Sequence, residues 1–398
     1  MNILIIGNGF DLAHELETSY SNILDFFEIV QSSFIKRNDV LEFCKFKLNN
    51  YKVSQFLKEY IKAVFASTEI EEGQIKNSNP LIQEIYEKLT DNIWYTYLNE
   101  LYKKKKMRGN NWIDFESEIS GIIEQIDREQ ENLDMPFDIN KIREDEKVKI
   151  FMSRLQSIIN SKAEINISTY DDFLKKSYSD LNRLIRCIEI YLIECIDKQE
   201  IHLFSQDIIQ CNAEAVLCFN YTHTYERVYA KRKNVTIHYL HGETNSRDKS
   251  FNNIVLGIDE YYKGKDKDRH TNYNIYKKFT QRIIKETGFQ YRDWIAKMNS
   301  ASKDWRSLSE NKKYEHELPN NVYIFGHSLD ITDKDVIKDF IDRDDVKTTV
   351  FYHDKQQQTQ QIANLVKLLG QKKFISMINK VPQRICFVSQ DEMKKYCK

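Results

Sequence analysis

The sequence predicts an α/β protein in which a large helical insertion follows the first strand of a parallel sheet. Residues 2–6 (NILII) form a short apolar run, which is typical of a buried parallel strand. Residues from about 12 to 210 show helical periodicity almost throughout, for instance across residues 181–195. After residue 213, short apolar segments alternate with helical patterns, which indicates βαβ units and a parallel sheet.

Composition limits the class of protein. The 398 residues include only 4 prolines and 11 glycines, which favours a largely helical chain, and 59 basic residues balance 60 acidic ones. This balance gives no reason to expect a nucleic-acid or membrane partner. The 7 cysteines contain no C-x-x-C pair, which indicates reduced thiols and no zinc framework. Since no segment looks like a signal peptide or a bilayer span, we expect a cytoplasmic protein.

The expected strands define the domain organisation. Besides residues 2–6, we expect strands at 215–219, 235–240, 253–256, 322–325, 348–352 and 385–388. The simplest architecture joins residues 1–20 and 213–398 in one nucleotide-binding domain. Residues 21–212 then form a helical insertion that acts as a lid, a sensor or an assembly domain. The charge-rich stretches 103–108 and 127–147 are expected to be loops or solvated faces.

The first strand ends in a glycine-bearing turn. Gly7, Asn8 and Gly9 would let the backbone approach a phosphate at the start of a helix, which predicts a Rossmann-like nucleotide site that includes Asp11. The G-x-G-x-x-G pattern is incomplete because Leu12 takes the third glycine position. The alternative is a tight turn with Asp11 as a helix cap. No P-loop motif occurs in the sequence.

Polar motifs also follow the later strands. Asn220 follows residues 215–219, His241 follows 235–240, and Gly257-Ile258-Asp259 follows 253–256. Since ligands bind at the carboxyl ends of parallel strands, we expect these motifs to converge on one crevice. His241 could transfer a proton near neutral pH, and Asn220 could bind a ribose or a water. The alternatives are a buried structural imidazole for His241 and an Asx turn for Asn220.

Two further histidines have structural interpretations. We expect His223 to be a structural residue on the helix that follows Asn220. His238 lies three residues before His241, and strand alternation would place the two on opposite faces, so no metal site is expected there.

A fourth polar motif, Gly326-His327-Ser328-Leu329-Asp330, follows residues 322–325. Gly326, His327 and Ser328 would line the nucleotide, and Asp330 would hold a ribose or adenine group. The alternative is helix-start chemistry for Asp330 and Asp333, with Thr332 and Asp335 at capping-box spacing.

In the insertion, Asp114 and Glu118 share one helix face at i, i+4 spacing. Either they face the pocket or they form an acidic first helical turn.

Taken together, these motifs resemble those of the AbiH family of bacterial abortive-infection proteins. The resemblance rests on GNGFDLAH, W-x-D-F-E, FNYTHTYE, YLHGE and GHSLDITDKD, which run in the family's order from residue 4 to residue 335. One departure is Glu15-Leu16-Glu17, where members often have Gly-Leu-Pro. The resemblance implies an effector of phage defence.

A more distant similarity is to sirtuin-like proteins. The glycine turn at 7–9, Asn220, His241-Gly242 and Gly326-His327-Ser328-Leu329 occur in the sirtuin-like order. That similarity implies an NAD site in which Asn220 and His241 are catalytic. Sirtuin deacetylases also carry paired C-x-x-C motifs, which this chain lacks, so the similarity favours the NAD hydrolases of phage defence.

The leading hypothesis is therefore an NAD glycohydrolase that uses no metal and acts on NAD or a related nucleotide. One alternative is a module that binds NAD or ADP-ribose as a signal without cleaving it. A second is a nucleic-acid-targeting toxin acting through the basic run Lys103–Arg108. Expected partners are the nucleotide, a phage-derived trigger protein and further copies of the chain.

Overall fold

The chain forms two compact units. The computed structural model describes residues 1–35, 55–66, 68–71, 74–77, 79–110, 112–132, 145–161, 167, 169–230, 234–245, 252–259, 273–309, 318–379 and 381–396. The sheet unit comprises Met1–Leu16, Glu200–Thr244 and Lys285–Lys398, and the helical unit comprises Glu17–Gln199 and Asn245–Ile284. The domain limits expected from the sequence stay a prediction.

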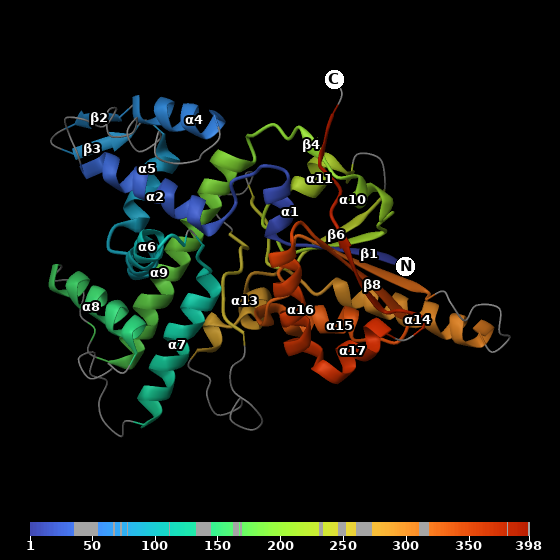
Figure 1. Cartoon of the computed structure of the whole chain (residues 1–398). Helices are drawn as coiled ribbons and strands as arrows, with labels where there is room; N and C mark the ends of the chain where they lie inside the picture. The colour runs from blue at the N-terminus through green and yellow to red at the C-terminus, as the bar shows by residue number, and fades with distance from the viewer. Residues whose placement is uncertain are drawn as a thin grey trace. The chain divides into compact units, whose positions relative to one another are not determined.

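The sheet unit is built on six parallel strands (Figure 1). Their order is β6-β5-β1-β7-β8-β9. If these six strands are renumbered 1 to 6 in chain order, the order becomes 3-2-1-4-5-6, which is the Rossmann order. The predicted α/β class with a Rossmann-like parallel sheet is therefore confirmed. The strands are β1 (Asn2–Ile6), β5 (Ala215–Cys218), β6 (Thr236–Tyr239), β7 (Asn320–Phe325), β8 (Val346–Tyr352) and β9 (Ile385–Ser389).

Both faces of this sheet are buried, which explains why β1 is an uninterrupted apolar run. Ile3 and Ile5 pack in one cluster with side chains of α14 (Tyr291–Ser309), α15 (Lys334–Ile341), α16 (Lys355–Leu369) and α17 (Gln371–Asn379). Leu4 and Ile6 pack in a second cluster with α1 (Asn8–Ala13), α10 (Gln206–Gln210) and α11 (Thr224–Val228). A small antiparallel pair, β4 (Leu203–Phe204) with β10 (Lys394–Lys395), completes the unit.

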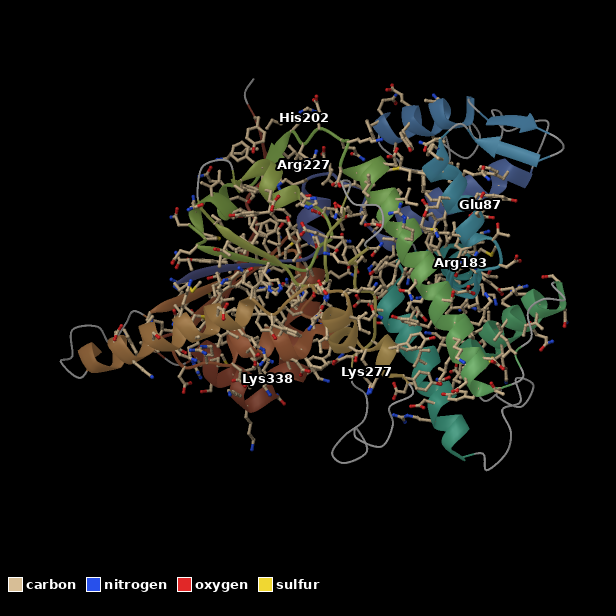
Figure 2. All side chains as sticks on the ribbon, turned by 180° about the vertical axis from the view of Figure 1, so that it is seen from behind. Glu87, Arg183, His202, Arg227, Lys277 and Lys338 are labelled. Atoms are coloured by element: carbon tan, nitrogen blue, oxygen red, sulfur yellow. The ribbon has the colours of Figure 1, made fainter. Side chains whose placement is uncertain are left out.

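The helical unit confirms the predicted helical insertion after the first strand. Asn92 caps its α6 helix by accepting a hydrogen bond from the Tyr95 N–H. Arg183 of α9 donates to the carbonyl oxygens of Glu87 and Thr90 at the end of α5, so a cation caps that helix end (Figure 2). The helices are α2 (Tyr20–Ile35), α4 (Gln55–Ala66), α5 (Pro80–Leu89), α6 (Ile93–Met107), α7 (Phe115–Asn132), α8 (Glu146–Ser161), α9 (Tyr170–Tyr191), the π-helical turn η1 (Leu192–Ile196), η3 (Asn274–Tyr276) and α13 (Lys278–Ile284).

One hairpin interrupts this helical pattern without having been predicted. Strands β2 (Thr68–Glu71) and β3 (Gln74–Asn77) pair in antiparallel fashion between α4 and α5. Among the described residues, no helix is both long enough and apolar enough to cross a membrane.

The basic run at 103–108 is the exposed end of a helix rather than a loop. It forms the last turn of α6, and four of its lysines pair with carboxylates of the same unit. The ion pairs are Lys103–Glu28, Lys104–Glu100, Lys105–Glu118 and Lys106–Asp25. Of the second charge-rich stretch, residues 133–144 lie outside the described residues, while its two ends belong to α7 and α8.

The prediction of a strand at 253–256 is wrong. Ile254, Val255 and Leu256 are fully buried in the helical unit, but they pair with no strand among the described residues. Instead, the Gln281 side-chain amide accepts from the Leu256 N–H and donates to the Leu256 carbonyl oxygen. A side chain therefore satisfies the backbone that a neighbouring strand would satisfy, and Gly257-Ile258-Asp259 does not extend from the sheet.

Candidate active site at the carboxyl edge of the sheet

The strand register places four predicted site residues at one level of the sheet. The last paired positions of β1, β5, β6 and β7 lie side by side; they are Ile6, Cys218, Tyr239 and Phe325. Two residues further along these strands come Asn8, Asn220, His241 and His327. These residues therefore lie at the same carboxyl edge, where Rossmann sheets bind ligands.

The two glycine turns at this edge pack directly against each other. The Gly9 N–H donates to the Gly326 carbonyl oxygen at 2.8 Å, and the Gly7 N–H donates to Phe325. A Cβ atom on Gly326 would lie 2.1 Å from the Phe10 nitrogen, and one on Gly9 would lie 2.8 Å from the Gly326 backbone. Gly326 also has a φ of +68°, so close approach and conformation both require glycine there. Asn8, between the two glycines of the first turn, is exposed.

Asp11 is buried beside a threonine of the β5 motif. The Thr222 hydroxyl donates to Asp11 Oδ2 at 2.6 Å, and the Thr224 hydroxyl donates to Thr222. Helix α1 begins after Gly7 and has no side-chain cap, so the alternative of Asp11 as a helix cap is wrong. Asp11 instead ties the first motif to the motif that contains Asn220.

Asn220 carries an unsatisfied polar group. Its side chain is 6% exposed, and its Nδ2 has no hydrogen-bond partner among the described residues. A buried amide without an acceptor costs free energy in the isolated protein. A ligand or water oxygen at this position would remove that cost.

His241 contacts a carboxylate that sequence reasoning did not assign to the site. Its Nε2 lies 3.0 Å from Asp333 Oδ1, and the His327 Nε2 lies 3.7 Å from Asp333 Oδ2. The ring of Phe219 packs edge-on against both imidazoles. The site therefore contains an aspartate between two buried histidines.

The helix start after β7 differs from the expected capping box. The expected capping box of Thr332 with Asp335 requires Thr332 at the N-cap of α15. The N-cap is instead the next residue, Asp333, and it makes no side-chain capping bond, so that prediction is wrong. Asp330 Oδ1 accepts from the Thr332 N–H, which is the helix-start role considered for it. Ser328 is exposed, and its hydroxyl accepts from the Asp330 N–H.

Helix α16 holds the loop that contains His327. Gln361 donates to the His327 carbonyl oxygen and Asn364 donates to that of Ser328. Leu329, in the same loop, has a φ of +59°, an unfavourable conformation for a non-glycine residue. Its N–H donates to His327 Nδ1 at 2.9 Å, so the strained residue orients the imidazole.

The remaining candidates have structural partners. His223 contacts Glu243, and His238 lies between the Thr287 carbonyl oxygen and the Tyr291 N–H. Within the described ranges, no cluster of side chains is suited to hold a metal ion.

In the helical unit, Asp114 precedes α7 and accepts from the N–H groups at its start. Glu118 pairs with Lys105 and Lys147. Burial opposes ionisation of Glu118, but these lysines prevail and lower its pKa.

Comparison of the sequence with known protein families identifies the family of this chain. A family model described as bacteriophage abortive infection AbiH matches residues 3–354. The chain belongs to the AbiH family. This confirms the resemblance drawn from the five motifs and gives the protein a role in abortive infection, a form of phage defence. No curated protein and no solved structure matches the chain.

Two other titratable groups near the candidate site remain protonated at neutral pH. Burial raises the pKa of the Cys218 thiol and of the Tyr239 hydroxyl, and the negative charge of Asp11 adds to both shifts. A protonated thiol is a poor nucleophile, so Cys218 is not suited to covalent catalysis. His241 is the better candidate for proton transfer.

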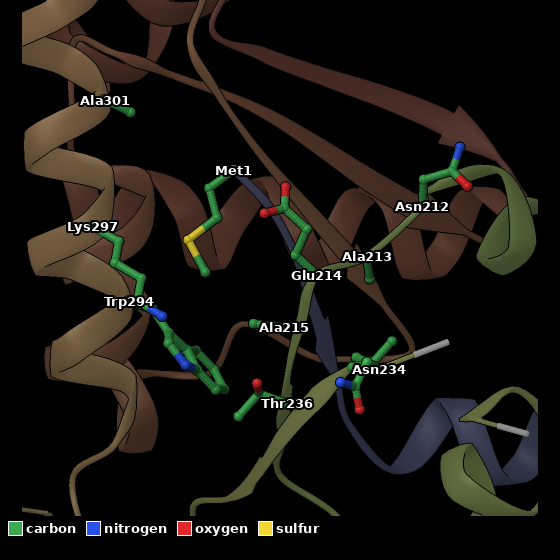
Figure 3. Close-up of a pocket in the computed structure, with 11 residues that line it drawn as sticks. Met1, Asn212, Ala213, Glu214, Ala215, Asn234, Thr236, Trp294, Lys297 and Ala301 are labelled. Carbon is green, nitrogen blue, oxygen red and sulfur yellow. The ribbon is translucent and has the colours of Figure 1, made fainter. Parts of the chain in front are cut away.

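A cavity of about 660 Å³ lies at the other edge of the same sheet (Figure 3). It is lined by Met1, Ala215 and Thr236, which lie at or just before the start of β1, β5 and β6, and by Trp294 and Lys297 of α14. None of the predicted site residues lines it. This cavity and the family motifs therefore lie at opposite edges of the sheet.

Sequence reasoning missed Asp333 because its partner is 92 residues away in the chain. Its position near a helix start suggested capping, and only the fold shows that its carboxylate turns towards His241. One signal was present: Asp333 belongs to the GHSLDITDKD motif, beyond the segment that was assigned to the nucleotide.

Proposed function

We propose that this AbiH protein binds NAD or a related nucleotide at the carboxyl edge of the sheet and hydrolyses its nicotinamide–ribose bond. The Rossmann strand order supports this location, since its reversal point lies between β1 and β7, at the two glycine turns. The single observation that carries the proposal is the placement of His241 and Asn220 at equivalent positions, two residues beyond the last paired residues of β6 and β5. The two strands are neighbours in the sheet, and Asn220 presents a buried amide that needs an acceptor.

The reaction needs a positioned sugar and an activated water. As the bond from ribose C1′ to the nicotinamide nitrogen breaks, its electron pair leaves with nicotinamide and C1′ becomes oxocarbenium-like. The oxygen of a water then bonds to C1′, and His241 accepts the proton that this water loses. Asn220 Nδ2 donates to a ribose hydroxyl or to the water. The products are nicotinamide and ADP-ribose, and no oxidant or metal is needed.

The glycine turn limits where the phosphates can lie. The N–H groups of Gly7, Gly9 and Phe10 already donate within the protein. The pyrophosphate would therefore approach the turn at the exposed Asn8 and at the exposed Ser328 of the facing loop. Asp11, His327 and Asp330 would shape the site around them.

The experiment is to incubate purified protein with NAD and to measure nicotinamide. Wild type should release it, whereas His241→Ala and Asn220→Ala should lose at least about 10²-fold in rate, the lower range for one acid–base group. His202→Ala is the matched control because His202 is an exposed histidine of the same unit. Its rate should equal that of wild type.

Thermal melts with and without NAD separate binding from catalysis. A ligand at a hundred times its Kd stabilises the native state by about 2.7 kcal/mol. His241→Ala should keep the NAD-induced shift. If wild type shows this shift but releases no nicotinamide, hydrolysis is wrong and the binding-module alternative holds.

The nucleic-acid alternative gains no support from α6, since the four lysines of its basic run pair with carboxylates.

A further inference from the structure

Asp333 sits where a helix cap would be expected, yet its carboxylate serves another group. It is the N-cap residue of α15 but makes no side-chain capping hydrogen bond. Its side chain is 11% exposed and contacts His241 through one oxygen. An ionised carboxylate only accepts hydrogen bonds, so the proton between them belongs to His241 Nε2. In the neutral imidazole, Nδ1 is then the basic nitrogen.

The second histidine is fixed in a matching orientation. His327 Nδ1 accepts from the Leu329 N–H, so its own proton is on Nε2, which faces the other Asp333 oxygen at 3.7 Å. The ring of Phe219 packs edge-on against both imidazoles. Both protonated nitrogens therefore face one carboxylate.

We infer that Asp333 is the positioning residue of the site. It holds His241 in the Nε2–H tautomer, leaves Nδ1 as the base that accepts the proton of water, and stabilises the imidazolium that this transfer produces. His327 helps to hold the carboxylate in place. The catalytic part of this inference rests on the proposed function, whereas the tautomer of His241 does not.

The test of the tautomer is nitrogen NMR of protein labelled with ¹⁵N-histidine. The His241 signals are assigned by their loss in His241→Gln. At neutral pH, wild type should show Nε2 protonated and Nδ1 unprotonated. Asp333→Asn should convert His241 partly or wholly to the Nδ1–H form, because the amide can donate to Nε2. Asp335→Asn, which removes the same charge from an exposed residue of α15, should leave the spectrum unchanged.

The test of catalysis uses the same variants. Asp333→Asn should lower the rate of nicotinamide release by about 10²-fold or more while keeping the NAD-induced thermal shift. Asp335→Asn should match wild type.

Two results would overturn the inference. One is a wild-type His241 protonated on Nδ1, a result that does not depend on whether Asp333→Asn folds. The other is an Asp333→Asn protein with an unchanged His241 spectrum. A wild type that releases no nicotinamide would refute the proposed function instead, and the spectrum would still decide the role of Asp333.

Discussion

His14 shows how a single residue couples the first motif to the rest of the sheet unit. Its Nδ1 lies 2.7 Å from the Phe10 carbonyl oxygen, so Nδ1 carries the proton. Nε2 then accepts from the Tyr229 hydroxyl, which itself accepts from the Ser205 N–H. Burial lowers the pKa of His14 to about 4, although the Phe10 carbonyl partly opposes that shift. The folded protein therefore holds a neutral imidazole.

The lowered pKa of His14 predicts that the free energy of unfolding depends on pH under acidic conditions. Between pH 6.5 and about 4, the unfolded chain protonates His14 while the folded protein does not. The free energy of unfolding should therefore fall by about 1.4 kcal/mol per pH unit in that window, and His14 should contribute no slope above it. Urea denaturation at pH 7 and pH 5 should show a loss about 2 kcal/mol smaller in His14→Gln than in wild type. Equal losses in the two proteins would contradict this assignment.

At the candidate site, residue types were predictable but their partners were not. His241 and Asn220 could be proposed because each follows a strand that the sequence reveals. The contacts of His241 with Asp333 and of Asp11 with Thr222 join residues 92 and 211 positions apart. Local pattern carries no information on such pairs, since they exist only after the strands have been ordered.

At the scale of elements, the two glycine turns behave as one structural feature. The helix that follows β1 and the loop that follows β7 approach each other so closely that backbone meets backbone. A Cβ atom added at this contact would meet backbone atoms, which cannot move aside by rotating as a side chain can. The turns therefore fix the backbone at the carboxyl ends of β1 and β7.

Substitution of these glycines should be costly. Gly326→Ala combines a left-handed backbone penalty of about 1–2 kcal/mol with overpacking of about 1–3 kcal/mol. Its thermal midpoint should fall by many degrees. The thermal midpoint of Gly9→Ala should also fall, but only because of overpacking. Gly121→Ala in α7 is the control. A Cβ there meets no atom within 4 Å, so it should stabilise the protein by about 0.5–1 kcal/mol. A Gly326→Ala protein that melts like wild type would refute the packing argument.

The strands of the parallel sheet were the most predictable elements. β1, β5, β6, β7, β8 and β9 all coincide with apolar runs found in the sequence, within a residue or two at most ends. The segment at 253–256 has the same composition but pairs with the Gln281 side chain, a choice that depends on tertiary contacts. The β2–β3 hairpin was missed because its strands, TEIE and QIKN, are short and polar.

At the scale of the whole molecule, the sheet unit is assembled from three separate stretches of chain. β1 is paired on both sides, with β5 and β7, although more than 200 residues separate it from β5. Alternation of strands and helices predicts that such a sheet is parallel. It does not predict the 3-2-1-4-5-6 order, which makes the strands before His241, Asn220, Asn8 and His327 consecutive neighbours in the sheet.

Family membership turns this geometry into a cellular expectation. An abortive-infection protein limits phage multiplication at the expense of the infected cell. Hydrolysis of NAD would do this by removing a cofactor that the phage and the cell both need. The proposed chemistry and the family role therefore make one joint prediction about NAD in infected cells.

The most direct test is to measure cellular NAD through a phage infection that the protein restricts. Cells carrying wild type should lose most of their NAD before lysis, with nicotinamide and ADP-ribose appearing as it falls. Cells carrying His241→Ala at the same protein level should keep their NAD and lose protection. If His241→Ala protects as well as wild type, or if wild type protects while NAD stays constant, then NAD hydrolysis at this site is not how the protein acts.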